Sequence, residues 1–92
     1  MVKKFLLGFL LDRRLRVISP IEVSLSKKQN KFIAIAFKIN EFGYGINPSE
    51  AIIDLQHTIA ELYFFLNKNK FKLGVDLQHT YNRLQSLIKY AP

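Results

Sequence analysis

The stretch Phe42-Gly43-Tyr44-Gly45-Ile46-Asn47-Pro48-Ser49-Glu50 marks the passage from a predicted strand to a long predicted helix. Asn47 can cap that helix by accepting from the amide of Glu50, and Pro48 at the first helical position has no amide to leave unpaired. Glu50 can reach back to the cap. We therefore expect a helix from Pro48 to about Asn67. Its apolar residues recur every three or four positions and form one stripe: Ile52, Leu55, Ile59, Leu62 and Leu66.

Three segments before this helix have the patterns of β-strands. Val17–Ser26 alternates apolar and polar residues, and the polar Lys27–Asn30 predicts a hairpin connection. Lys31–Ile39 is apolar on both faces, which indicates a central strand, with small alanines that let another element approach closely. Glu41–Ile46 alternates with Gly43 and Gly45. Glycine weakens a strand, so the two glycines predict a bulge, a bend or a close backbone approach.

The two ends of the chain carry a second helical pattern and an N-terminal apolar run. A second helix is predicted from Val75 or Asp76 to about Tyr90, with Asp76 as its cap. Residues 1–16 form a possible arm or extra strand, and their apolar run could also dock on a second copy of the chain. Strands followed by helices predict one α+β domain over residues 1–92. We expect a three- or four-stranded antiparallel sheet covered by one long helix, plus a C-terminal helix at one end.

Composition excludes several classes of protein. The chain has 92 residues, of which 49% are hydrophobic and 23% charged, so a disordered chain is not expected. It has no cysteine, which excludes disulfides and thiolate metal sites. The apolar run after Lys4 is shorter than a membrane span and is closed at once by Asp12-Arg13-Arg14, without a cleavage site of small residues. We expect a cytoplasmic protein.

The net charge of +7 allows attraction to nucleic acid, anionic lipid or an acidic protein. The basic residues form clusters beside predicted turns, so they also suit solvated connections that keep a small protein soluble. No recognised nucleic-acid motif surrounds them. The alternative function is a basic nucleic-acid-binding module, for which the candidate residues are Arg13, Arg14, Arg16, Lys27, Lys28 and Lys31; a further cluster is Lys68, Lys70 and Lys72.

One short repeat carries the two histidines. Asp54-Leu55-Gln56-His57-Thr58 recurs as Asp76-Leu77-Gln78-His79-Thr80. The repeat could bring two Asp–His pairs to a metal or proton-transfer site, or it could reflect two amphipathic helices built from the same residue types. No third histidine and no recognised ligand spacing accompany it. The carboxylates are spread along the chain, and no nucleophile or phosphate-loop motif is present. We expect no catalytic, cofactor or metal site, and therefore no enzyme.

The segment from Phe32-Ile33-Ala34-Ile35-Ala36-Phe37 through Gly43-Tyr44-Gly45 to Ser49-Glu50-Ala51-Ile52 resembles the HicB-like family over roughly residues 17–67. That family consists of small antitoxin-type domains with a partial RNase H-like fold. The resemblance rests on Gly45, Asn47, Glu50 and Ala51, and on the helix that follows. It implies a non-catalytic domain that neutralises a small RNA-cleaving toxin and often forms dimers or tetramers. The chain lacks the proline common before the glycines, has Asn47 where Thr or Ser is commoner, and is too short at its C-terminus for a helix-turn-helix.

We therefore predict a protein-interaction domain whose partners are a small toxin-like protein and further copies of itself, with nucleic acid as a possible partner and no membrane. Aromatic anchors dominate protein interfaces. The candidate contact residues are exposed aromatics: Phe42, Tyr44, Tyr63 and Phe65.

Overall fold

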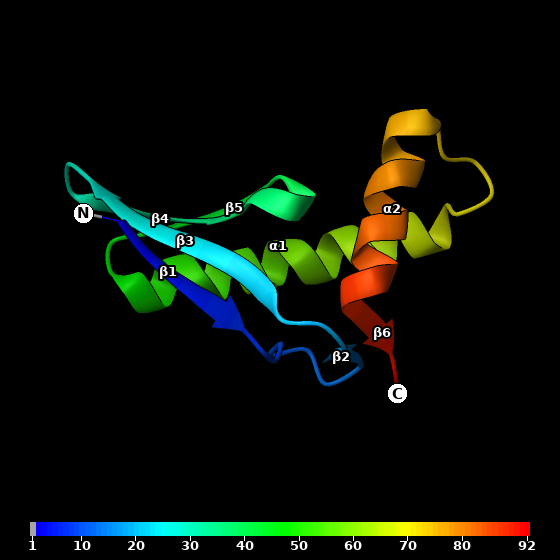
Figure 1. Cartoon of the computed structure of the whole chain (residues 1–92), viewed down its shortest axis with the longest axis horizontal. Coiled ribbons are helices and arrows are strands. Elements are labelled where there is room, and N and C mark those ends of the chain that lie inside the picture. Colours follow the sequence, from blue (N-terminus) through cyan, green and yellow to red (C-terminus); the bar gives the residue numbers. More distant parts are fainter. Residues whose placement is uncertain (1) are drawn as a thin grey trace.

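The computed structural model describes residues 2–92, which fold as α+β (Figure 1). Four antiparallel strands form one sheet, a long helix packs on it, and a second helix stands at one end of the long helix. The fold class is the one that the sequence predicts. The elements in chain order are β1 (Val2–Leu7), β2 (Leu15–Val17), β3 (Ile21–Lys28), β4 (Lys31–Ala36), the 3-10 helix η1 (Phe37–Ile39), β5 (Glu41–Gly45), α1 (Pro48–Lys68), α2 (Val75–Leu87) and β6 (Ile88–Tyr90).

The main sheet has the strand order β1-β3-β4-β5. Val2–Leu7 forms an edge strand of this sheet, pairs antiparallel with β3 and places Phe5 opposite Val23. Met1 lies outside the described residues. The strand predicted over Val17–Ser26 is divided, because Pro20 has no amide to donate and precedes the first paired residue of β3. Leu15–Val17 forms a separate strand instead.

The predicted cap begins α1. The side-chain oxygen of Asn47 accepts from the backbone amide of Glu50 at 2.9 Å. The carboxylate of Glu50 accepts from the side-chain amide of Asn47 at 3.0 Å, where a capping box would use the backbone amide of that residue. Within the helix Leu55, Ile59 and Leu66 are fully buried. The periodic stripe therefore forms the contact between the helix and the rest of the core.

Both glycines of β5 face α1 at very short range, which confirms the predicted close backbone approach. A Cβ atom added to Gly43 would collide with the Ala51 carbonyl oxygen and the Leu55 amide nitrogen. One added to Gly45 would lie 2.6 Å from the amide nitrogen of Ala51. Opposite Gly43 on β4 lies Ala34, which is fully buried. Small side chains on two neighbouring strands thus let the helix backbone lie directly on the sheet.

One predicted strand and one predicted connection are shorter than expected. The strand predicted over Lys31–Ile39 stops at Ala36, and the next residues form η1, which ends at Ile39 and is followed by Asn40 with a φ of 52°. Asparagine tolerates this left-handed conformation better than most residues do. The turn brings the chain back along β4 as β5. In the predicted connection Lys27–Asn30, Lys27 and Lys28 still belong to β3, and only Gln29 and Asn30 form the turn.

The second helix ends at Leu87 instead of Tyr90, because Ile88–Tyr90 pairs antiparallel with β2. Ile88 is buried in this strand. The helical pattern therefore indicates correctly that Ile88 is a core residue, but it predicts the wrong backbone conformation for this residue. The expected cap at Asp76 is also wrong. Gly74 occupies the cap position, and no side chain caps this helix. The hydroxyl of Tyr81 donates to the Asn67 side chain at 2.7 Å and joins α2 to α1.

Candidate interaction surface

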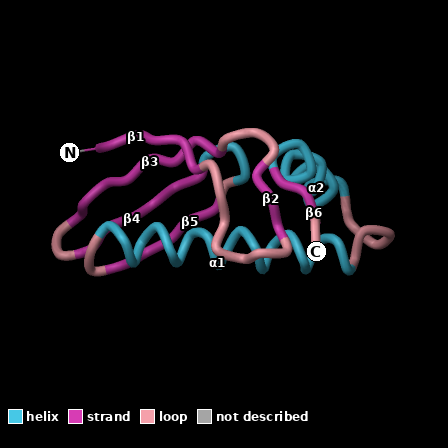
Figure 2. The backbone as a smooth tube through the Cα atoms, turned by 90° about the horizontal axis from the view of Figure 1, so that it is seen from below, coloured by secondary structure: helices cyan, strands magenta, loops and turns pink. Residues whose placement is uncertain are grey.

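One face of the main sheet is left without a covering layer by the elements that residues 2–92 form. The helix α1 packs against β5 and β4 from one side and runs along that side of the strands in Figure 2. Successive side chains of a strand point to opposite faces, so the residues between the helix-facing glycines point away from α1. We call this side the open face. It comprises Val2, Lys4 and Leu6 of β1, Glu22, Ser24, Ser26 and Lys28 of β3, Lys31, Ile33 and Ile35 of β4, and Phe42 and Tyr44 of β5.

Large apolar side chains gather on the open face at β4 and β5. Tyr44 lies opposite Ile33 in the register, and Phe42 lies opposite Ile35. Tyr44 is 54% exposed and Phe42 38%, whereas both isoleucines are partly buried. The four side chains therefore form two cross-strand pairs of the kind that stabilises sheets, but their outer surfaces meet solvent.

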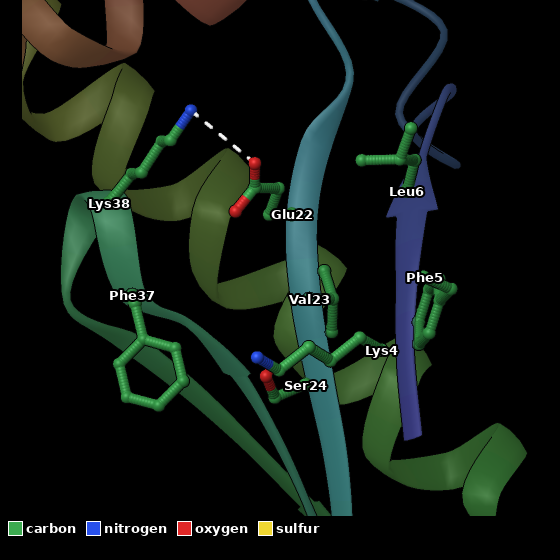
Figure 3. A pocket seen from close by; sticks show the side chains of 8 residues that line it. All are labelled: Lys4, Phe5, Leu6, Glu22, Val23, Ser24, Phe37 and Lys38. Atoms are coloured by element: carbon green, nitrogen blue, oxygen red, sulfur yellow. Dashed lines mark ion pairs between the residues drawn. The ribbon is translucent and has the colours of Figure 1, made fainter. Parts of the chain in front are cut away.

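A hollow of about 310 Å³ opens on the same face between β1 and η1 (Figure 3). Leu6 and Lys4 stand on one side of it, and Phe37 and Lys38 stand on the other. Phe37 is 67% exposed, because β4 has ended and η1 carries its side chain outward. The residues on β3 between these two sides are Glu22, Val23 and Ser24.

Positive charge surrounds this apolar surface. The open face and the adjacent η1 hold four lysines and one carboxylate, that of Glu22. The Lys38 ammonium lies 3.8 Å from that carboxylate, with both side chains more than half exposed. Such a pair contributes little to stability in water. The lysines are Lys4, Lys28, Lys31 and Lys38.

The four aromatic residues predicted to contact a partner do not lie together. Phe42 and Tyr44 share the open face, but Phe65 lies on α1, on the other side of the sheet, where it is 56% exposed. The expectation that Tyr63 is exposed is wrong. Tyr63 is 6% exposed, and its ring centroid lies 6.3 Å from that of Tyr81 on α2. Three consecutive aromatic residues on a helix do not reveal which one a later helix will cover.

Other residues of the surface were not among the predicted contacts. Leu6 and Lys4 belong to the segment that could be an arm, and the alternation of Val2, Lys4 and Leu6 is the signal that could have placed them on one face. Phe37 was placed on a strand that ends before it. Ile33 and Ile35 lie in the strand predicted to be apolar on both faces, and that pattern does not distinguish a core residue from a contact residue.

The six basic residues proposed for nucleic acid form two separate groups. Arg13, Arg14 and Arg16 lie in and before β2, near the start of β3, whereas the three lysines flank the β3–β4 turn at its other end (Figure 1). Arg14 is engaged within the chain. Its guanidinium lies 2.7 Å from the carboxylate of Asp12 and 4.2 Å from the ring centroid of Phe64. The hydrogen bond from Arg14 holds the pKa of Asp12 below its ordinary value. The fold does not bring the two groups into one basic surface.

Both copies of the repeat are helical, as the second interpretation of the repeat predicts. In each copy the threonine hydroxyl donates to the aspartate carbonyl four residues earlier, at 3.0 Å for Thr58 and 3.3 Å for Thr80. His57 lines a hollow beside α1 with Asp12 and Glu61, and His79 lies on α2; both histidines are exposed. Across residues 2–92 no three His, Cys, Asp or Glu side chains gather as a metal site would require.

Comparisons with known proteins add no assignment: no family model matches the chain, and neither the curated proteins nor the solved structures contain a match. In the part of the chain that the structure describes, neither helix has the length and apolar character needed to cross a bilayer.

Proposed function

We propose that this chain is a non-catalytic protein-interaction domain that binds its partner through the open face. The observation that carries this proposal is the second apolar face of the sheet, where Phe42 and Tyr44 are exposed beside Ile33 and Ile35. Contiguous exposed apolar surface in a small protein commonly marks an interaction site. Aromatic side chains supply much of the binding energy of protein interfaces.

The positive charge of the open face favours a partner with an acidic surface. Lysines surround the apolar residues, and one carboxylate lies among them, already beside Lys38. Complementary charge speeds association and excludes partners of like charge. A protein with an acidic surface therefore suits the open face better than a second copy of this chain, in which lysines would meet lysines.

The narrower proposal, a HicB-type antitoxin in the cytoplasm, is supported by the sequence resemblance alone. Two of its motif residues have structural uses, since Gly45 lies against α1 and Asn47 caps it. An RNA-cleaving toxin binds a polyanion and so presents positive charge. The lysines of the open face would oppose such a surface, and the partner of this face is better sought among acidic proteins.

Replacing both exposed aromatics of the open face tests the proposal. The double variant Phe42→Ser/Tyr44→Ser should reduce partner recovery at least about tenfold in affinity capture from nuclease-treated cell extract. Phe65→Ser replaces an aromatic on α1 that is about as exposed as Tyr44, and it should leave recovery unchanged. Quantitative mass spectrometry of the captured proteins and circular dichroism of each variant supply the measurements. An equal loss of partner recovery with the double variant and with Phe65→Ser would contradict the proposal. Recovery from untreated extract that nuclease treatment abolishes would also contradict it and would favour nucleic acid.

A further inference from the structure

The two edges of the main sheet are treated differently by the rest of the chain. At the β5 edge the backbone amide of Tyr44 points away from β4 and donates to the carboxylate of Asp54 on α1 at 2.8 Å. The helix itself packs along this strand. A further strand added at β5 would have to displace that hydrogen bond and the helix beside it.

The register of the sheet identifies the outward-pointing groups at the β1 edge. Backbone groups of successive residues in an antiparallel strand point alternately to its two neighbours. The outward amide of Tyr44 sets this alternation for β5, and the pairings carry it through β4 and β3 to β1. Phe5 then pairs inward with Val23, so the backbone groups of Lys4 and Leu6 point outward. Within residues 2–92 no hydrogen bond closes them.

The surroundings of this free edge are positively charged and continuous with the open face. Lys3 and Lys4 are both exposed and point to opposite faces of β1. Leu6 is 63% exposed and forms one side of the hollow that Phe37 and Lys38 face (Figure 3). Lysine on an edge strand opposes pairing with a like-charged strand. The same two ammonium groups would attract a strand that carries carboxylates.

We propose that β1 is a strand-addition site for an extended acidic segment of the partner protein. This inference rests on the proposed function, since it names how the partner engages a surface that includes Leu6 and Lys4. The added strand would take hydrogen bonds from the outward groups of β1, and the carboxylates on one of its faces would lie beside Lys4. Its apolar side chains would point to the opposite face, beside Phe5. A second copy is disfavoured, because each copy carries a charge of +7 and two adjacent lysines in this strand.

The test uses two synthetic probes and the full chain labelled with 15N. The acidic probe is acetyl-Glu-Val-Glu-Phe-Glu-Val-Glu-amide, and the control peptide has lysine in place of every glutamate. The acidic probe should shift the amide resonances of Lys4 and Leu6 and slow their hydrogen exchange at least threefold, while the amides of Phe42 and Tyr44 stay unchanged. Equal effects of both peptides, effects confined to the β5 edge, or no effect at millimolar probe would overturn the proposal.

A pair of variants at one position separates the backbone contact from the charge. Lys4→Thr keeps the outward amide and should weaken acidic-probe binding about threefold, whereas Lys4→Pro removes the amide and should weaken it about tenfold. Equal binding by the two variants would overturn the proposal. Proline also fixes the backbone φ, so hydrogen exchange of the parent chain is measured as well. A Lys4 amide that exchanges as slowly as the Phe5 amide without probe would place it in the ladder with β3 and would overturn the proposal. If these tests fail while Phe42→Ser/Tyr44→Ser still loses its partner, the proposed function stands and the strand-addition site does not.

Discussion

The covered and open faces of β4 and β5 differ in the size of their side chains. Under α1 the middle of these two strands presents Gly43, Gly45, Ala34 and Ala36, and the larger Phe32 and Glu41 lie on the same face at its two ends. On the other side the same strands present isoleucine, phenylalanine and tyrosine. Small residues are needed where a helix backbone approaches a sheet closely, and large ones are not excluded where no backbone lies above them. The contrast shows that residue size, in addition to hydrophobicity, distinguishes the face that this chain covers from the face that it leaves open.

The largest expected effect comes from adding one methyl group to the covered face. Gly43→Ala places a Cβ against the backbone of Ala51 and Leu55, which cannot rotate away. We expect a loss of about 3 kcal/mol in the free energy of unfolding, measured by urea denaturation. Gly8→Ala is the matched control, because no atom lies within 4 Å of the added carbon. Similar stabilities for the two variants would contradict the close approach.

A smaller effect is expected where α1 closes the β5 edge. Asp54→Ala removes the carboxylate that accepts the Tyr44 amide, which should lower the free energy of unfolding by about 1 kcal/mol. Asp76→Ala, at the equivalent position of the repeat, removes no such contact with a strand and should cost about 0.3 kcal/mol through the helix dipole. Thermal and urea unfolding of both variants would measure the difference. An equal loss in the free energy of unfolding at the two positions would show that the hydrogen bond to Tyr44 does not stabilise the protein measurably.

On the open face, truncating a large side chain should lower the free energy of unfolding by less than the two changes above. Tyr44→Thr keeps a good strand former and removes a ring that is already more than half exposed. We expect the free energy of unfolding to fall by about 0.5 kcal/mol, the scale of one cross-strand pair. A loss of several kcal/mol in urea denaturation would mean that the ring belongs to the core and that the open face is already covered.

The smallest effect concerns a carboxyl at the start of β5. Burial raises the pKa of Glu41 above its ordinary value of 4.5. The folded state therefore favours the protonated form, and its stabilising contribution is complete below pH 4.5 and is lost as pH rises through the raised pKa. Glu41→Gln should be more stable than the parent chain at pH 7 and should lose this advantage below pH 4.5. Urea unfolding at the two pH values measures it, with Glu61→Gln as the control for the change in net charge.

The sequence predicts the fold where local chemistry and packing agree. The Asn47 cap, the stripe of α1 and the paired glycines of β5 each identify an element and also the contact that it makes. The prediction fails where a distant segment decides the local conformation. Ile88 is apolar at a helical spacing, yet its backbone pairs with Val17. No pattern within α2 contains that information.

The candidate site is predictable only in part for the same reason. Alternation places Phe42 and Tyr44 on one face, but it does not show which face of the sheet the helix will choose. Tyr63 and Phe65 are separated by two positions of one helix, and α2 determines that the first is buried. The hollow beside Leu6 requires β1 to be the edge strand and β4 to end at Ala36, which are both properties of the assembled sheet.

The pairing of β2 with β6 has a consequence for the order in which the chain folds. Each strand of the main sheet pairs with a strand that lies before residue 46, whereas β2 finds its ladder partner only at Ile88–Tyr90. Contacts between segments so far apart form late, because a long loop must close first. We therefore expect the second sheet to form after the main sheet.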